Sequence, residues 1–271
     1  MTALETIAVA FAMFSAIPCP QPVWTEKNMR YCLCAFPLVG AVCGLLCGGW
    51  AALLGVLHAP DLLLAGGICL IPVLVTGGIH LDGFADTSDA LASCAPPEKK
   101  REILQDPRCG AFAVIRLCAW FLADFVLCAV VRWDARALVC LGLAFVLERC
   151  LSGWAIASFP MAKNTGLAHT FAAAADKKRV RAVLSVFIMA LVAALVVVGR
   201  MAGLAMAVTA GVVLLLYRRT AVKQFGGITG DLAGWFLQRA ELFMLAALAA
   251  VQLLAAQPWA AQLTEGGWLW F

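Results

Sequence analysis

The sequence predicts an all-α protein, a polytopic transmembrane helical bundle of about seven spans plus a short N-terminal re-entrant or interfacial helix. The 271 residues are 63% hydrophobic and 13% charged, whereas a soluble domain is nearer half apolar and a quarter charged. Apolar runs near the 20 residues needed to cross a hydrocarbon core recur along the chain. Helices are expected because a chain in lipid must satisfy its own backbone hydrogen bonds.

Seven apolar runs are long enough, or nearly so, to cross the membrane. No internal repeat divides them, so residues 1–271 are expected to form a single integral-membrane domain. The runs cover roughly 31–57, 62–79, 111–131, 137–159, 182–199, 201–217 and 240–256.

The two ends of the chain differ from these runs. The stretch 3–17 is shorter and ends at Pro18, so it is either a marginal eighth span or a re-entrant or interfacial helix. The tail 257–271 is expected at the membrane interface, where tryptophans gather; it carries Trp259, Trp268 and Trp270.

The basic residues sort the connections between runs into two sets. Connections of one parity carry most of the Lys and Arg residues, whereas those of the other parity hold only Arg132, Arg136 and Arg200. By the positive-inside rule the first set faces the cytoplasm. These short basic loops lack interleaved aromatics, so no nucleic-acid partner is expected. The expected cytoplasmic loops are 18–30, 80–110, 160–181 and 218–239.

The most informative motif, Gly77-Gly78-Ile79-His80-Leu81-Asp82-Gly83-Phe84-Ala85-Asp86-Thr87-Ser88-Asp89, lies in one of these loops. On a helix, Asp82, Asp86 and Asp89 share one face, where three carboxylates repel each other unless a cation compensates them. Oxygen ligands favour Mg²⁺, which commonly binds carboxylates together with substrate phosphates. We therefore expect a Mg²⁺ site for phosphoryl transfer, which Asp106 would join. The alternative is a solvated acidic turn, less favoured beside an apolar span.

A second polar segment is Gly226-Gly227-Ile228-Thr229-Gly230-Asp231, which follows Lys223. Glycine backbone N–H groups next to a lysine suit a phosphate or nucleotide, although Gly-Gly is also an ordinary turn. The candidate phosphate-binding residues here are Lys223, Gly226, Gly227 and Thr229, and Asp231 is a candidate catalytic carboxylate.

Several other polar residues have two interpretations each. Arg149, inside an apolar run, either pairs with Glu148 or contacts a substrate phosphate. Arg116 and Asp124 have the same alternatives, with a structural role favoured. Lys163 and Arg108 are candidate phosphate contacts, Arg108 being otherwise an interfacial anchor. His80 ranks below the aspartates.

The motif at 77–89 resembles the signature of the cobalamin synthase family, the adenosylcobinamide-GDP ribazoletransferases of vitamin B12 assembly. The resemblance extends in order and spacing along the chain. The other similar segments are Phe36-Pro37-Leu38-Val39-Gly40, Asp106 with Arg108-Cys109-Gly110, Arg149, Ala162-Lys163, Gly166-Leu167, Phe171 and 226–231. Lys163, Ala168 and Ala90 depart from the family pattern, and a lysine at 163 gives up the bidentate phosphate geometry of arginine.

The resemblance implies a catalytic domain in a bacterial inner membrane that joins α-ribazole, or its 5′-phosphate, to adenosylcobinamide-GDP. GMP would leave, adenosylcobalamin or its 5′-phosphate would form, and Mg²⁺ would be required. Asp82, Asp86 and Asp89 would hold the metal while the ribazole 5′-hydroxyl attacks, and Asp89 or Asp231 would take its proton. A tethered assembly with other nucleotide-loop enzymes would explain the lipid environment.

Two rival functions fit less well. A CDP-alcohol phosphotransferase places Ala-Arg after its first Asp-Gly, whereas Asp82-Gly83 precedes Phe84-Ala85-Asp86 here. An ion-coupled transporter predicts repeated halves and acidic residues near span centres, and the sequence indicates neither.

Overall fold

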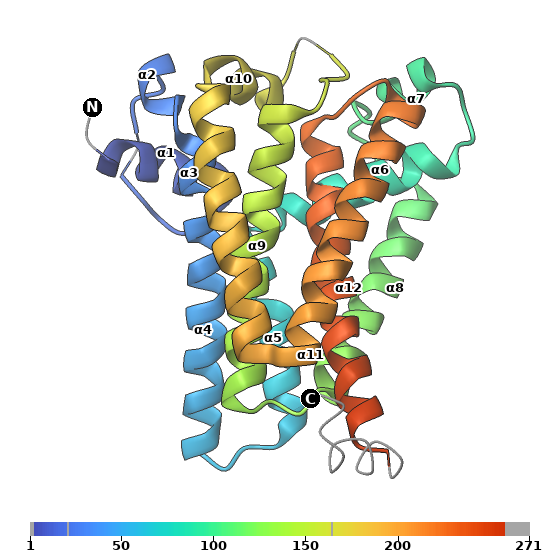
Figure 1. The fold of residues 1–271 in the computed structure, drawn as a ribbon. Helices are drawn as coiled ribbons and strands as arrows, with labels where there is room; N and C mark the ends of the chain where they lie inside the picture. Colours follow the sequence, from blue (N-terminus) through green and yellow to red (C-terminus); the bar gives the residue numbers. More distant parts are fainter. Residues whose placement is uncertain (1–2, 21, 164, 258–271) are drawn as a thin grey trace.

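The computed structural model describes residues 3–20, 22–163 and 165–257 as a bundle of long helices capped at one end by short ones (Figure 1). Within these residues there is no strand, only an isolated bridge between Met161 and Ile228. The expected all-α class is confirmed. The expected interfacial tryptophans Trp259, Trp268 and Trp270 lie outside the described residues. The helices are α1 Ala3–Phe14, α2 Glu26–Met29, α3 Cys32–Ala35, α4 Pro37–Val56, α5 Asp61–Thr76, α6 Ile79–Ala92, α7 Pro97–Ile103, α8 Ala111–Val130, α9 Ala135–Ser158, α10 Leu167–Ala174, α11 Lys177–Phe225 and α12 Gly230–Ala255.

The long helices provide the expected membrane passes. Five stretches, Cys32–Val56, α8, α9, α11 and α12, are long and apolar enough to cross, and α5 with α6 forms a further pair bent by 92°. Helix α11 is broken at Arg200, where φ is 51° and ψ is −125°, so it descends the bundle and returns (Figure 1). With its second arm the described helices make seven passes, and the chain is a multi-pass membrane protein.

Two helix boundaries differ from the sequence expectation. Helix α11 continues to Phe225 rather than ending near 217, and α12 begins at Gly230 rather than near 240. Charged and glycine residues interrupt the apolar runs at these two ends, so hydropathy misses them: α11 continues as polar turns, whereas residues 232–238 of α12 are buried in the bundle. The expected loop 218–239 therefore shrinks to the turn 226–229.

Helix α1 is too short to cross the membrane. Its 12 residues span about 18 Å at 1.5 Å per residue, against a core of about 30 Å. It lies beside α2 and α3 at one end of the bundle (Figure 1), and the chain after it is tied to α5 where the Ala16 N–H donates to the Val75 carbonyl at 2.8 Å. This favours the interfacial or re-entrant alternative.

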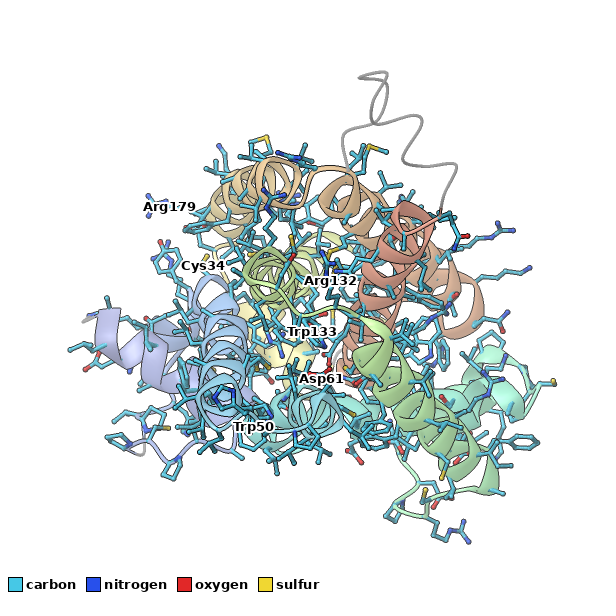
Figure 2. All side chains as sticks on the ribbon, turned by 90° about the horizontal axis from the view of Figure 1, so that it is seen from below. Cys34, Trp50, Asp61, Arg132, Trp133 and Arg179 are labelled. Atoms are coloured by element: carbon cyan, nitrogen blue, oxygen red, sulfur yellow. The ribbon has the colours of Figure 1, made fainter. Side chains whose placement is uncertain are left out.

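Helix α9 occupies the centre of the bundle, between α4, α11 and α12 (Figure 2). The outer helices direct large apolar side chains away from the protein, as a lipid-facing surface requires. Examples are Leu45, Leu122, Val197 and Leu215.

The connections sort to the two ends of the bundle as expected. Helices α2, α7 and α10 and the turn between α11 and α12 lie together at the upper end of Figure 1. Arg132, Arg136 and Arg200 line a shared hollow that belongs to the other end. The lysine-rich loops therefore share one face.

Candidate active site

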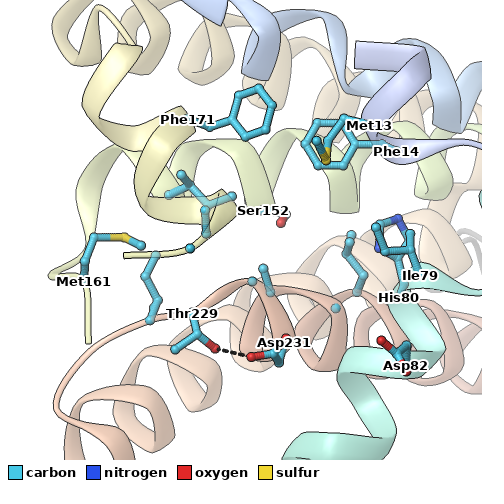
Figure 3. A pocket seen from close by; sticks show the side chains of 18 of the residues that line it. Met13, Phe14, Ile79, His80, Asp82, Ser152, Met161, Phe171, Thr229 and Asp231 are labelled. Carbon is cyan, nitrogen blue, oxygen red and sulfur yellow. Dashed lines mark hydrogen bonds between the residues drawn. The ribbon is translucent and has the colours of Figure 1, made fainter. Parts of the chain in front are cut away.

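A cavity of about 470 Å³ opens at the upper end of the bundle, among α1, α3, α6, α9, α10 and the start of α12 (Figure 3). Three of the four expected cytoplasmic loops, 80–110, 160–181 and 218–239, contribute polar groups to it. Residues far apart in sequence therefore meet in this cavity. The polar lining residues are His80, Asp82, Ser152, Lys163, Thr165, Thr229 and Asp231.

Helix α6 reaches this cavity because the chain turns sharply at Gly77 and Gly78. Both residues have positive φ, 63° and 78°, which side-chain-bearing residues rarely adopt. The turn produces the 92° bend between α5 and α6, so α6 crosses the bundle instead of continuing along it. The motif that begins with two glycines thereby brings Asp82 to the cavity.

Asp231 on α12 lies close to α6, the helix that carries Asp82, Asp86 and Asp89. A Cβ atom added at Gly83 would lie 2.7 Å from the Asp231 carbonyl oxygen and 2.8 Å from its Cα, so only glycine permits this approach. The carboxylates of Asp82, Asp231 and Asp89 are near enough to repel the charge of Asp86. The structure thus concentrates negative charge where α6 meets α12.

The chemistry of this donor set fits a hard cation, because Asp82, Asp86 and Asp231 offer only oxygen ligands. Among the described residues, no three His, Cys, Asp or Glu side chains converge closely enough to hold a metal unaided. Mg²⁺ typically uses one or two carboxylates and completes its shell with water and phosphate oxygens, so this partial set suits it.

Asp89 has a different set of partners from the other aspartates of the motif. Its two carboxylate oxygens accept hydrogen bonds from the backbone N–H groups of Gly110 at 2.6 Å and Ala113 at 2.8 Å. These are unpaired donors at the start of α8, so Asp89 caps that helix from α6. A side chain at residue 110 would clash with this carboxylate. In this arrangement both Asp89 oxygens are occupied by protein groups.

Asp106 and Arg108 pair with each other. The Arg108 guanidinium donates to the Asp106 carboxylate at 2.9 and 2.7 Å, and its backbone N–H donates at 3.0 Å. These hydrogen bonds lower the pKa of Asp106 to about 2. Neither residue lines the cavity, so the structure does not bring the expected fourth metal ligand or the Arg108 phosphate contact to it.

The glycine turn between α11 and α12 holds the loop between α9 and α10 in place. The Ile228 N–H donates to the Pro160 carbonyl at 2.8 Å, and the Ala162 N–H donates to the Ile228 carbonyl at 2.9 Å. At Gly227 an added Cβ would lie 2.5 Å from the Met161 backbone. This pairing fixes the segment that leads to Lys163, and Gly226 and Gly227 serve the turn.

Two residues beside this turn belong to the cavity. The Thr229 hydroxyl accepts from the Leu232 N–H at 3.2 Å, which caps α12, and donates to Asp231 at 3.3 Å (Figure 3). Lys163 lines the same cavity and attracts the Asp231 carboxylate electrostatically. Lys223 is exposed and lines a different hollow, outside the cavity.

Arg149 takes the structural alternative. It is 1% exposed, and its guanidinium donates to Glu148 at 2.6 Å and to the Phe145 carbonyl at 2.9 Å. Glu148, Glu241 and Asp124 lie close enough together inside the bundle to influence each other. The expectation that no acidic residues lie near span centres is therefore wrong. Glu148 pairs with Arg149, Glu241 lies near both, and Asp124 accepts a hydrogen bond from the Cys128 thiol.

Sequence reasoning missed one entire side of the cavity. Phe14 and Phe171 form an apolar wall opposite Asp82 and Asp231 (Figure 3), and their ring centroids are 5.8 Å apart. The Nε2 atom of His80 and the hydroxyl of Ser152 are buried in the lining without a hydrogen-bond partner. His80 and Phe171 belong to segments named in the sequence analysis without this role, Ser152 is visible as a polar residue within an apolar run, and Phe14 left no signal.

Known proteins resemble the chain over most of its length. A family model described as cobalamin-5-phosphate synthase matches residues 6–249. A protein of Lachnoclostridium phytofermentans named adenosylcobinamide-GDP ribazoletransferase is 39% identical over 248 residues, covering 92% of this chain and 94% of the relative. A protein of Stutzerimonas stutzeri with the same name is 33% identical over 249 residues, covering 90% and 97%. No solved structure matches the chain. By the match over 6–249 and these relatives, the chain belongs to the cobalamin-5-phosphate synthase family.

Proposed function

We propose that this protein joins α-ribazole, or its 5′-phosphate, to adenosylcobinamide-GDP, with release of GMP and formation of adenosylcobalamin or its 5′-phosphate. The names of the relatives identify the reaction class. The observation that carries the proposal is the single cavity in which Asp82, Asp231 and Lys163 meet. Carboxylates beside a cation suit a phosphate group that must be held while one of its bonds is exchanged.

Mg²⁺ is the proposed cofactor, and Asp82 and Asp86 would hold it together with phosphate oxygens of the substrate, because Mg²⁺ usually takes one or two carboxylates. When bound, it neutralises phosphate charge and supports in-line displacement. Asp89 and Asp106 were candidates for this set. Asp89 caps α8 and Asp106 is paired with Arg108, so we assign metal binding to Asp82 and Asp86 of α6 and leave Asp231, across the α6–α12 contact, free to accept a proton.

The reaction exchanges a phosphoanhydride bond of adenosylcobinamide-GDP for a phosphate ester bond to ribazole. A ribose hydroxyl oxygen of ribazole attacks the phosphorus nearer the cobinamide, and the bond from that phosphorus to the oxygen shared with GMP breaks. The electron pair leaves with GMP, and Asp231 takes the hydroxyl proton. The 5′ oxygen is excluded as the nucleophile when it carries a phosphate that the product keeps, so the earlier expectation of 5′ attack is corrected to a ring hydroxyl.

The cavity suggests how the substrates are oriented. Its volume of about 470 Å³ lies within the usual range for small-molecule sites, so it accommodates the nucleoside end while the corrin stays outside. We place the aromatic base of ribazole against Phe14 and Phe171, and its ribose toward Asp231 across the cavity. Lys163 then contacts the phosphates.

The cavity is proposed to face the cytoplasm of a bacterial cell. The lysine-rich loops share its end of the bundle, and the positive-inside rule places such loops on the cytoplasmic side of the inner membrane.

The direct test supplies purified, detergent-solubilised protein with adenosylcobinamide-GDP, α-ribazole and Mg²⁺ and measures GMP release. Asp82→Asn should lower kcat by about 10²- to 10³-fold, as loss of a main charge-stabilising group does. Asp61→Asn is the matched control, because Asp61 is exposed at the start of α5, directly after the turn from α4 at the end of the bundle away from the cavity. No GMP release by folded protein, or full activity of Asp82→Asn, would contradict the proposal.

A further inference from the structure

A second hollow, of about 440 Å³, lies between α6, α8 and α12 and shares no lining residue with the cavity. Its charged lining residues are both arginines, Arg116 on α8 and Arg239 on α12. The rest of its lining is mostly apolar, including Trp235, Leu242 and Phe243. The reaction described above uses none of these groups.

Both arginines lack an acidic partner. No ion pair among the described residues includes either of them. Their guanidinium groups are near enough to repel each other. Arg239 is held against two rings, 4.5 Å from the Trp235 centroid and 5.4 Å from the Phe243 centroid. Two unpaired cations in a partly apolar setting are stabilised by an anion placed between them.

A neighbouring hollow strengthens this positive charge. It shares Leu91, Trp235 and Arg239 with the first and adds Arg219 and Lys223 from α11. No Asp or Glu lines either hollow. The arrangement is complementary to a ligand with concentrated negative charge.

The hollow also opens toward the lipid. Phe112 and Ile115, on the same turns of α8 as Arg116, are exposed large apolar residues, and Phe243 in the lining is 41% exposed. Arg116 lies in the second turn of α8, near the lysine-rich end of the bundle. A free phosphate would satisfy only the arginines, whereas a phospholipid would also cover the apolar rim. Basic pockets between membrane helices on the cytoplasmic side are known to take lipid headgroups.

We propose that this hollow binds an anionic phospholipid, with its phosphate between Arg116 and Arg239 and its acyl chains along Leu242 and Phe243. Phe84 and Ser88 place α6 in the wall of the hollow, while Asp82 of the same helix lines the cavity. The bound lipid therefore braces from outside the helix that carries the acidic motif.

Native mass spectrometry of the purified protein with added phosphatidylglycerol or phosphatidylcholine tests the site. The wild type should retain phosphatidylglycerol in preference to phosphatidylcholine. The double variant Arg116→Gln/Arg239→Gln should lose at least about 10-fold in phosphatidylglycerol retention, because both charge-assisted hydrogen bonds to the phosphate are lost. Arg116→Lys/Arg239→Lys keeps both charges and should retain the lipid.

The matched control is Arg132→Gln/Arg136→Gln, which removes two arginines from the opposite end and should leave retention unchanged. Gel filtration and thermal unfolding of each variant establish that it is folded. Equal retention by wild type and the folded Gln variant would overturn the proposal. So would displacement of the lipid by millimolar inorganic phosphate, which would identify a soluble anion as the ligand. None of these measurements depends on the proposed reaction.

Discussion

At the scale of single residues, Asp82 and Asp89 lie on the same helix but have different roles. Asp82 lines the cavity, whereas the Asp89 carboxylate caps α8 through Gly110 and Ala113. The sequence predicts their shared helical face from spacing alone. It does not predict the division of roles, because the partner of Asp89 is 21 residues away and is a backbone group. Gly110 is the only sign of this contact in the sequence, because a side chain at that position would clash with the Asp89 carboxylate.

Stability should separate these two aspartates. Asp89→Ala leaves two backbone donors of α8 unpaired and should lower the free energy of unfolding by about 1–3 kcal/mol. Asp82→Asn relieves repulsion with Asp86 and should stay within about 0.5 kcal/mol of the wild type. Thermal unfolding in detergent without Mg²⁺ measures both. Equal losses would show that Asp89 has no special structural role.

The apolar wall of Phe14 and Phe171 predicts how the affinity for α-ribazole should respond to mutation. Phe171→Ala removes a ring on which the ribazole base is proposed to stack, which should raise KM for α-ribazole about 5- to 100-fold. The KM for adenosylcobinamide-GDP should change little. Phe187→Ala, which truncates an exposed phenylalanine of α11, is the control. An unchanged ribazole KM in Phe171→Ala would place the base elsewhere.

At the scale of elements, hydropathy locates the helices but not their ends. The break at Arg200 falls between the two runs expected there, and α8 matches its run within one residue. The first turns of α12 were expected to be a loop, because glycine and charged residues interrupt the apolar run there, although residues 232–238 are buried in the bundle. The bend before α6 depends on positive φ at Gly77 and Gly78, which the Gly-Gly pair only permits.

Packing between α6 and α12 should be sensitive to a single methyl group. Gly83→Ala would drive Cβ into the Asp231 backbone, separate the two helices and cost about 1–3 kcal/mol of stability. Activity should fall with it, because Asp82 and Asp231 move apart. Gly49→Ala, in open space on α4, should be neutral or stabilising. Similar thermal unfolding and kcat in both variants would contradict this account of the contact.

At the scale of the whole molecule, most of the site prediction rests on the expectation that alternate loops, those rich in Lys and Arg, lie on one face of the membrane. This arrangement brings Asp82, Lys163, Thr229 and Asp231 to one cavity, as expected. The alternation of the loops predicts at which end of the bundle a residue lies but not where its side chain points. It therefore does not predict that Lys223 points away from the cavity. The role of the wall from α1 and α10 could not be predicted: the resemblance includes Phe171, but an apolar side chain in a cavity looks like any other in the sequence.

Labelling of cysteines tests the orientation of the bundle. Cys94 is exposed in the connection after α6 and should react with a membrane-impermeant maleimide only in inside-out vesicles. A cysteine introduced by Arg136→Cys, at the opposite end, should react only in intact cells. Labelling of both sites from the same side would rule out the seven-pass arrangement.

The short helix α5 sets the depth of the reaction site. Its 16 residues rise about 24 Å, roughly 6 Å less than the hydrocarbon core, so α6 and the cavity floor lie below the level of the headgroups. The surroundings there polarise less than bulk water. A pair of unit charges 4 Å apart interacts with about 1 kcal/mol in water but about 4 kcal/mol at an effective dielectric constant of 20. The attraction between the carboxylates of α6 and a cation is thus amplified by the membrane itself, and removing the lipid around α5 weakens it.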